Sequence, residues 1–254
     1  MAAISSSSYK ALLVDLDGTL ARPFLYVSPQ VTEAVKRANE VLAVTIVSSR
    51  EHEVVGEIAN GLGLKALQIS EGGARIFDPV TQESPWFFTL ASDDAQLIMS
   101  FLERNQLPFS AVAGRESIET MRDVTDWRIS RISATKLAQP QAEDIARCFG
   151  AMGGVHTTVI VRIDNGDWMV DFTHAEATKA TAVRRFAELN GIESSQIIAA
   201  GDSYNDIPLL EACGLRIAMG NAVPELNALA DYVAPSVDQD GLATAIDEFV
   251  LPRL

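Results

Sequence analysis

Two aspartates and a glycine stand close together near the start of the chain, at the end of a short apolar run. Asp15 and Asp17 are two residues apart, and Gly18 follows them. One carboxylate can attack phosphorus to form an acyl phosphate, while a second protonates the leaving oxygen and then deprotonates the attacking water. Gly18 permits a tight turn that would aim both carboxylates at one substrate. An Asp-Gly pair also fits an ordinary turn, so the interpretation depends on other segments.

Two further segments carry groups that could hold a phosphoryl group. The hydroxyl of Ser48 and the backbone N–H groups after it could donate to phosphoryl oxygens near a helix start. A helix N-cap would also explain Ser48, and for Arg50 we favour solvation of the helix start over a phosphate contact. Lys179 opens a predicted helix, where the macrodipole opposes positive charge. Lys179 could be a solvated lysine on the surface. Alternatively, its ammonium could clamp the phosphoryl group and the nucleophile, which would give it the anionic partner that its position calls for.

A fourth segment, Gly201-Asp202-Ser203-Tyr204-Asn205-Asp206, follows an apolar Ile-Ile-Ala-Ala run. Asp202 suits Mg²⁺, which prefers a few carboxylates and water in octahedral geometry. Asp206 suits either a water-mediated metal ligand or a partner that orients Lys179, and Asn205 could hydrogen-bond to either group. The alternative is an Asp N-cap with an acidic first turn, which would stabilise any helix.

The charges of these segments predict a cation at the place where they meet. Asp15, Asp17, Asp202 and Asp206 in one cleft would repel one another and raise one another's pKa values. A bound Mg²⁺ and Lys179 would supply three positive charges. We therefore expect a magnesium site and a phosphoryl site in the same cleft.

The elements that must position these residues alternate between strands and helices. Open parallel sheets bind ligands at the carboxyl ends of their strands, and Asp15, Ser48 and Asp202 all stand at the ends of apolar runs. The predicted strands are residues 10–16, 43–47, 66–69, 196–200, 215–219 and 232–234. The predicted helices are residues 29–42, 51–62, 178–190, 207–213, 224–230 and a last one from 241. This alternation predicts an α/β fold: a Rossmann-like core with a parallel sheet between two helical layers.

The middle of the chain follows a different pattern. Residues 73–89 read as an antiparallel hairpin, and Asn165-Gly166 is a strong hairpin signal between two strand-like runs. Two helices, residues 93–105 and 140–152, and antiparallel strands predict an inserted α+β cap. We expect a discontinuous core of residues 1–83 and 176–254, with residues 84–175 as a cap that sets substrate specificity.

Composition narrows the expected partners and compartment. The chain has 254 residues, 48% of them hydrophobic, and a formal net charge of −14. This acidity argues against nucleic acid and anionic membrane surfaces as partners. No apolar run is long enough for a membrane span, residues 1–9 lack the features of a signal peptide, and two distant cysteines suggest no disulfide. We expect a cytoplasmic protein, monomeric or homodimeric, that binds a small phosphorylated molecule.

Taken together, the motifs resemble those of the haloacid dehalogenase superfamily. They are Asp15-x-Asp17-Gly18-Thr19-Leu20, Ser48, Lys179 and Gly201-Asp202-x-x-Asn205-Asp206, in that order. The position of the insert and the segments 206–211, 218–222 and 230–233 look like the Cof-type sugar-phosphatase branch (subfamily IIB).

The resemblance implies specific roles. Asp15 would be the nucleophile and Asp17 the acid and base. Mg²⁺ would bind the Asp15 carboxylate, the Asp17 backbone carbonyl and Asp202, with Asp206 behind them. Ser48 and Lys179 would bind the phosphoryl group. To these we add three further candidate phosphate- or substrate-binding residues, which are Ser49, Asn205 and Gly72.

The chain departs from the Cof-type pattern at two places that bear on the site. Ser48-Ser49-Arg50 replaces the usual Thr-Gly-Arg and keeps the hydroxyl. Glu71-Gly72-Gly73 replaces a common Asn-Gly-Ala, which we expect to change how the substrate is held at the cap hinge.

The expected function is a Mg²⁺-dependent hydrolase of small phosphomonoesters, sugar phosphates above all, that works through an aspartyl-phosphate. A phosphomutase or phosphotransferase with the same intermediate is one alternative. A non-catalytic phosphate-binding module is another, although binding alone would not need Asp17.

Within the cap, four residues are candidate substrate contacts, although a surface or hinge role is favoured for each. They are Arg128, Arg131, Arg162 and His174. His156 and His174 stand too far from acidic or cysteine clusters to suggest zinc. For Trp86-Phe87-Phe88, packing within the cap is favoured over lining of the cleft.

Overall fold

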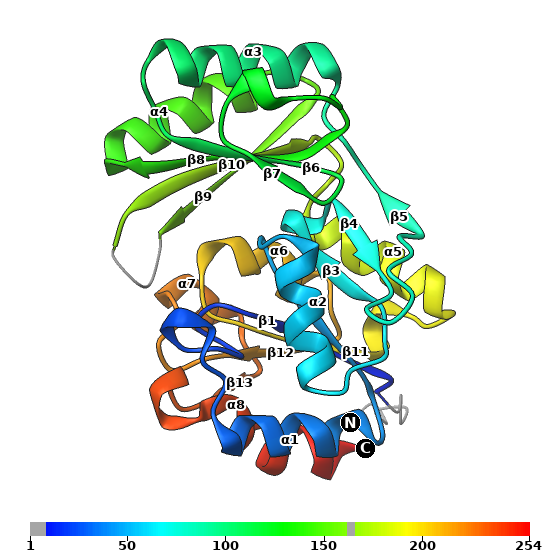
Figure 1. The fold of residues 1–254 in the computed structure, drawn as a ribbon. Coiled ribbons are helices and arrows are strands. Elements are labelled where there is room, and N and C mark those ends of the chain that lie inside the picture. Colours follow the sequence, from blue (N-terminus) through cyan, green and yellow to red (C-terminus); the bar gives the residue numbers. More distant parts are fainter. Residues whose placement is uncertain (1–8, 162–165) are drawn as a thin grey trace.

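Two β-sheets organise the residues that the computed structural model describes, which are 9–161 and 166–254 (Figure 1). The larger sheet has the order β13 (Tyr232–Val233), β12 (Leu215–Ala218), β11 (Ile197–Gly201), β1 (Ala11–Asp15), β2 (Ala43–Val47), β3 (Gln68–Ser70), β4 (Arg75–Phe77) and β5 (Trp86–Phe87). Its strands are parallel from β13 to β3, and β4 and β5 are antiparallel. The predicted parallel core is confirmed.

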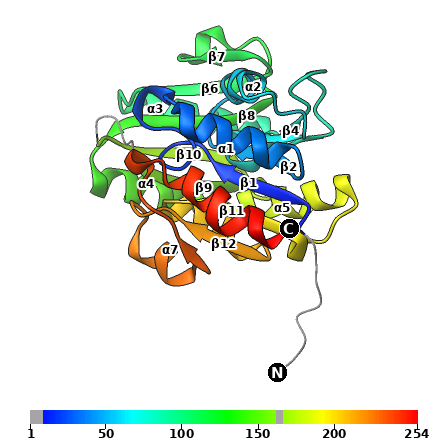
Figure 2. The same cartoon turned by 90° about the horizontal axis from the view of Figure 1, so that it is seen from below.

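Helices cover both faces of this sheet, because both faces of its strands are apolar. In β1, Leu12 and Val14 pack into one hydrophobic cluster, whereas Ala11 and Leu13 pack into another. Such burial on two sides is typical of parallel sheets. The first cluster includes residues of α1 (Pro29–Asn39), α2 (His52–Gly61) and α8 (Gly241–Thr244), and the second includes residues of α5 (Lys179–Asn190), α6 (Ile207–Glu211) and α7 (Pro224–Leu229). Figure 2 shows α1 beside the C-terminal helix.

The ends of two helices follow the sequence signals. The Val31 amide donates to the Ser28 hydroxyl at 3.2 Å, and Pro29 begins α1. In α5, the Thr181 amide donates to the Thr178 hydroxyl at 3.1 Å, and Gly191 ends the helix in the left-handed conformation.

The second sheet is antiparallel throughout and forms a separate lobe. Its order is β7 (Glu116–Ile118), β6 (Phe109–Ala113), β8 (Ile129–Leu137), β10 (Trp168–His174) and β9 (Val155–Val161). The helices α3 (Ser92–Arg104) and α4 (Gln139–Gly150) lie on its outer face (Figure 1). Ile132 and Phe172 belong to the hydrophobic cluster beneath these helices, so the alternate residues of the same strands face the core.

The segment around β5 differs from expectation. Trp86 packs against the core cluster, and the guanidinium of Arg185 lies 5.2 Å from the centre of its ring, so the prediction of packing within the cap is wrong for Trp86. The core sheet therefore continues past residue 83, and the domain boundaries remain a prediction. Asn165 and Arg162 lie outside the described residues.

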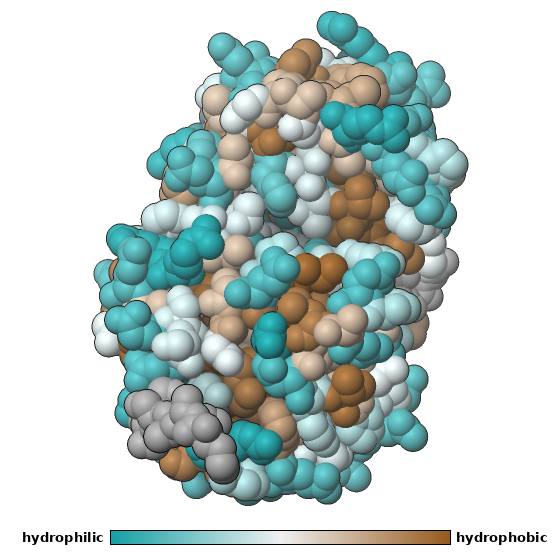
Figure 3. Space-filling model, turned by 180° about the vertical axis from the view of Figure 1, so that it is seen from behind, coloured by the Kyte–Doolittle hydropathy of each residue, from teal (hydrophilic) through white to brown (hydrophobic). Residues whose placement is uncertain are grey.

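The surface is mostly hydrophilic where Figure 3 shows it, with apolar patches that gather near the junction of the lobes. In the described ranges, no helix combines the length and the apolar character that crossing a membrane requires.

Candidate active site

The tips of three core strands meet at one cleft between the lobes. Asp15 ends β1, Ser48 follows β2 and Asp202 follows β11, and all three line a cleft of about 670 Å³. Asp17, Ser49 and Asn205 line the same cleft. Segments that are distant in the sequence thus come together at the carboxyl ends of the parallel strands, where such sheets bind ligands.

Lys179, the first residue of α5, connects two of the carboxylates. Its ammonium donates to Asp15 Oδ1 and to Asp206 Oδ1, both at 2.6 Å, and the lysine is only 5% exposed. Burial alone would lower the pKa of Lys179, but the two carboxylates outweigh it and raise that pKa above its usual value. The ammonium therefore stays charged and holds Asp15 and Asp206 together.

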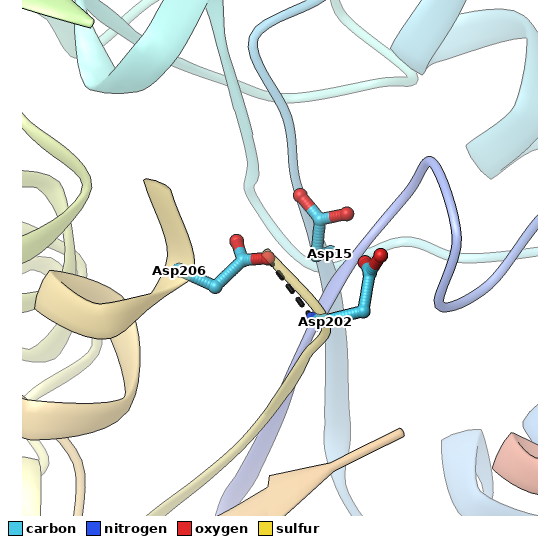
Figure 4. Close-up of side chains that lie close together, drawn as sticks. All are labelled: Asp15, Asp202 and Asp206. Atoms are coloured by element: carbon cyan, nitrogen blue, oxygen red, sulfur yellow. Dashed lines mark hydrogen bonds between the residues drawn. The ribbon is translucent and has the colours of Figure 1, made fainter. Parts of the chain in front are cut away.

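Asp206 uses both carboxylate oxygens within the protein. Its Oδ1 accepts from Lys179, and its Oδ2 accepts from the Ser203 backbone amide at 3.0 Å. The same Oδ2 accepts from the Asp202 backbone amide at 3.1 Å (Figure 4). Of the two roles considered for Asp206, these contacts fit the partner that orients Lys179.

The carboxylates of Asp15, Asp202 and Asp206 form a cluster that fits a divalent cation. One oxygen from each lies within 4.8 Å of the others, and carboxylate oxygens are the ligands that Mg²⁺ prefers. Burial and repulsion from Asp206 raise the pKa of Asp15, against the effect of Lys179. The same two causes raise the pKa of Asp202 to about 7. A bound cation would relieve this crowding of negative charge.

The position of Asp202 is fixed by its neighbours. Its Oδ1 accepts from the Thr19 hydroxyl at 2.9 Å, and its Oδ2 accepts from the side-chain amide of Asn221 at 3.3 Å. Gly18 packs directly against it, because a Cβ there would lie 2.3 Å from Asp202 Oδ2, and its φ of +91° also favours glycine.

Arg50 was expected to solvate the helix start, but its side chain binds Asp17 instead. Its Nε and Nη2 donate to the two carboxylate oxygens of Asp17, each at 2.7 Å, in a bidentate ion pair. The Arg50 amide donates to the Ser48 hydroxyl at 3.1 Å, and Glu51 takes the N-cap position of α2 instead of Ser48. The loop of residues 48–50 thus presents its hydroxyl and its guanidinium beside the two aspartates.

Of the two remaining candidate binding residues, one lines the cleft and the other lies behind it. Asn205 lines the cleft and accepts from the Ser203 hydroxyl. Gly72 is not among the residues that line the cleft, but its amide donates to the Ser48 carbonyl at 3.1 Å. Gly72 therefore supports the loop of residues 48–50 from behind.

The hinge residue Glu71 is fully buried in a charged cluster. His52 Nδ1 lies 3.0 Å and Arg75 Nε 3.3 Å from its Oε1. Burial raises the pKa of Glu71, but its contacts with His52, Arg75 and Ser130 outweigh this and lower it. Because the Glu71 amide also donates to the Arg50 carbonyl at 2.9 Å, the hinge is tied to the loop of residues 48–50.

The cap candidates differ in where their side chains lie. Arg131, 6% exposed, lines the cleft, donates to the Ser49 carbonyl and pairs with Glu51 at 3.4 Å. Arg131 thus joins the cap to the loop of residues 48–50, whereas Arg128 is an exposed partner of Asp126.

Three other residues lie near the hinge or the acidic cluster. His174 stacks on Phe88 with ring centres 4.6 Å apart, which fits the hinge role. Thr19 and Asn221 were given no role from the sequence, although both orient Asp202. Both stand in segments that carry the family resemblance, Thr19 in the first motif and Asn221 in residues 218–222, and this was the signal that could have found them.

The comparisons with known proteins agree with this geometry. A profile of haloacid dehalogenase-like hydrolases matches residues 12–133 and 116–246. The putative phosphatase YxeH of Bacillus subtilis is 24% identical over 96% of this chain and 100% of its own length. A phosphoglycolate phosphatase of Methanothermobacter thermautotrophicus is 25% identical over 95% of this chain and 99% of its own. A solved haloacid dehalogenase-like hydrolase from B. subtilis has a TM-score of 0.84 at 22% identity, covering 94% of this chain and 99% of its own. The chain therefore belongs to the haloacid dehalogenase-like hydrolase family.

Proposed function

We propose that the protein is a Mg²⁺-dependent phosphatase that hydrolyses small phosphomonoesters, sugar phosphates among them, through an aspartyl-phosphate on Asp15. The observation that carries the proposal is the Lys179 ammonium, bonded at 2.6 Å to both Asp15 and Asp206 beside Asp202. The full-length similarity to proteins named as phosphatases supports the reaction class.

In the first step, a carboxylate oxygen of Asp15 attacks phosphorus while the bond from phosphorus to the leaving oxygen breaks. The Lys179 ammonium favours the ionised form of Asp15, which the attack requires. Asp17 in its protonated form gives its proton to the leaving oxygen, so that the product departs as an alcohol. When bound, Mg²⁺ would be held by Asp15 and Asp202 and would neutralise charge on the phosphoryl oxygens.

In the second step, water attacks the phosphorus of the aspartyl-phosphate and the bond to Asp15 breaks. Asp17, now ionised, takes the proton from that water, so the enzyme returns to its starting state. Arg50 holds the Asp17 carboxylate at the edge of the cleft, and the Ser48 hydroxyl is placed to donate to a phosphoryl oxygen.

The leaving group would lie against the cap. Ser110, Ser133 and Thr135 line the cap side of the cleft with hydroxyl groups. Such groups exchange hydrogen bonds with the hydroxyls of a sugar, which supports sugar phosphates as substrates.

The test is the release of phosphate from p-nitrophenyl phosphate with and without Mg²⁺. We expect turnover that EDTA abolishes and that Asp15→Asn lowers by at least about 10³-fold, because no nucleophile remains. Asp126→Asn is the matched control, since Asp126 pairs with Arg128 on the cap surface and should leave turnover unchanged. Full activity of the Asp15→Asn protein would refute the proposal.

A further inference from the structure

A phenylalanine stands exposed at the mouth of the cleft, on the loop between β1 and α1. Phe24 is 88% exposed, yet it lines the cleft together with its neighbours Pro23 and Leu25. Phe24 and Leu25 have φ angles of +64° and +58°, which bulky L-residues seldom adopt. Folding alone gives no reason to keep a large apolar side chain in water on a strained backbone, and such strain gathers at functional sites.

The base of this loop is held firmly, so the position of its tip is defined. The Arg22 guanidinium pairs with Asp240 at 2.6 Å and donates to the carbonyls of Val237 at 3.1 Å and Asp238 at 3.0 Å. The Arg22 amide also donates to the Tyr26 carbonyl at 3.0 Å. The loop therefore presents Phe24 as a fixed apolar surface toward the cleft.

The cap opposite this loop changes from polar to apolar along its strands. In one cross-strand row, Ser110 pairs with Ser133, and Ser133 pairs with Asp171. In another, Met169 pairs directly with Ile160, and both side chains are half-buried and line the cleft. Met169 and Asp171 share one face of β10 two residues apart, so the rows are separated by about 7 Å.

The two rows lie over different parts of the core. Arg131, Ser133 and Thr135 follow one another on the same face of β8, and Arg131 touches Ser49 next to Ser48. The apolar row of Met169 and Ile160 lies on β10 and β9, and β9 contacts the segment Tyr204–Asp206 that follows Asp202. Behind Ser133, which donates to Asp171 Oδ1, the other Asp171 oxygen has no hydrogen-bond partner in the described part of the chain.

We propose that the substrate's leaving group is amphipathic: a hydroxylated segment that lies against the polar row, joined to a planar ring that is held between Phe24 and the Met169–Ile160 row. Hydroxyls of the first segment would bond to Ser110 and Ser133. The apolar ring would cover Phe24 and so remove from water the side chain that the loop exposes. The inference rests on the proposed phosphatase function and names the substrate class of the same cleft.

Two pairs of esters that differ only in the ring test this inference. Uridine 5′-monophosphate is compared with ribose 5-phosphate, and riboflavin 5′-phosphate with ribitol 5-phosphate, by kcat/KM for phosphate release. We expect the ring-bearing ester of at least one pair to be preferred by about tenfold or more. Phe24→Ala should lower that preference by about tenfold, because the ring loses its stacking partner.

Leu97→Ala is the matched control. Leu97 is 53% exposed on the outer helix α3, away from the cleft, so its removal should leave the preference intact. Phe24→Gly provides a second check on folding, because glycine accepts a positive φ and the residue is not buried. Its melting temperature should equal or exceed that of the wild type, while the preference for the ring falls as in Phe24→Ala.

Turnover of p-nitrophenyl phosphate distinguishes a wrong substrate class from a wrong phosphatase function. If it is hydrolysed but neither pair shows a preference, or the preference survives Phe24→Ala, the inference is wrong and the phosphatase stands. If no ester is hydrolysed, the phosphatase function fails and the inference falls with it.

Discussion

At the scale of single residues, one buried ammonium offsets the charges of several carboxylates. Lys179→Met would leave the buried carboxylates of Asp15 and Asp206 without their positive partner. We expect the free energy of unfolding of the metal-free protein to fall by about 3 kcal/mol, as when one partner of a buried ion pair is removed. Turnover should fall by about 10³-fold, because Asp15 loses the group that favours its ionised form.

Urea denaturation and phosphate release measure these two effects. The matched control is Lys36→Met, because the Lys36 ammonium is half-exposed and pairs with Glu33 on the surface. A Lys179→Met protein as stable as this control would contradict the role given to the ammonium.

At Gly18 the backbone packs against Asp202, a residue of the proposed metal site. In Gly18→Ala the new Cβ would press on Asp202 Oδ2, and the φ of +91° adds strain. Asp202 must then move, so we expect the Mg²⁺ concentration for half-maximal activity to rise about tenfold or more, with a loss of about 2 kcal/mol in stability. Gly61→Ala is the comparison, since nothing lies within 4 Å of a Cβ there. An unchanged Mg²⁺ activation curve for Gly18→Ala would argue against Asp202 as a ligand.

At the scale of elements, the sequence predicted which residues lie at the strand tips, but not the side-chain contacts between those tips. Asp15 and Asp202 were predictable, because each follows an apolar run whose length and composition indicate a buried parallel strand. The pairing of Arg50 with Asp17 was not, since it joins two loops 33 positions apart through side-chain directions that no local pattern encodes. Arg131 and Ser49 are 82 positions apart and meet only when the cap lies on the core.

The hinge is an element whose stability should depend on pH. The folded-state pKa of Glu71 lies below its ordinary value, so its ionised form stabilises the fold above about pH 4.5 and this contribution is lost as the pH falls. We expect Glu71→Gln to lower the free energy of unfolding by about 1–3 kcal/mol at pH 7, because His52 and Arg75 lose a charged partner. The difference from the wild type should shrink below pH 4.5.

Denaturant unfolding between pH 3.5 and 7 measures this dependence. Glu57→Gln, on the exposed face of the same helix as His52, should show no such trend. If the deficit of Glu71→Gln were constant over this range, the carboxylate charge would not be its cause.

At the scale of the whole molecule, two lobes share one cleft, and the side chain of Arg131 ties one lobe to the other. It leaves β8 of the cap, reaches the Ser49 carbonyl and pairs with Glu51, so the cap holds the loop that carries Ser48. A cap in this position would also shield the proposed aspartyl-phosphate from bulk water, which is how closure governs many active sites.

Arg131→Met should loosen this connection while keeping most of the apolar volume. We expect faster amide hydrogen exchange in residues 48–51, a larger radius of gyration by solution scattering, and kcat/KM lowered by about 10–100-fold, since the loop is no longer positioned by the cap. Arg128→Met removes a guanidinium from the same strand region, but one that is exposed and bound only to Asp126 in the contacts described, so it should change none of these quantities. Because the exchange and scattering measurements need no substrate, they separate a contact between the lobes from a direct contact with the ester. Unaltered exchange at residues 48–51 in Arg131→Met would mean that the core alone fixes this loop.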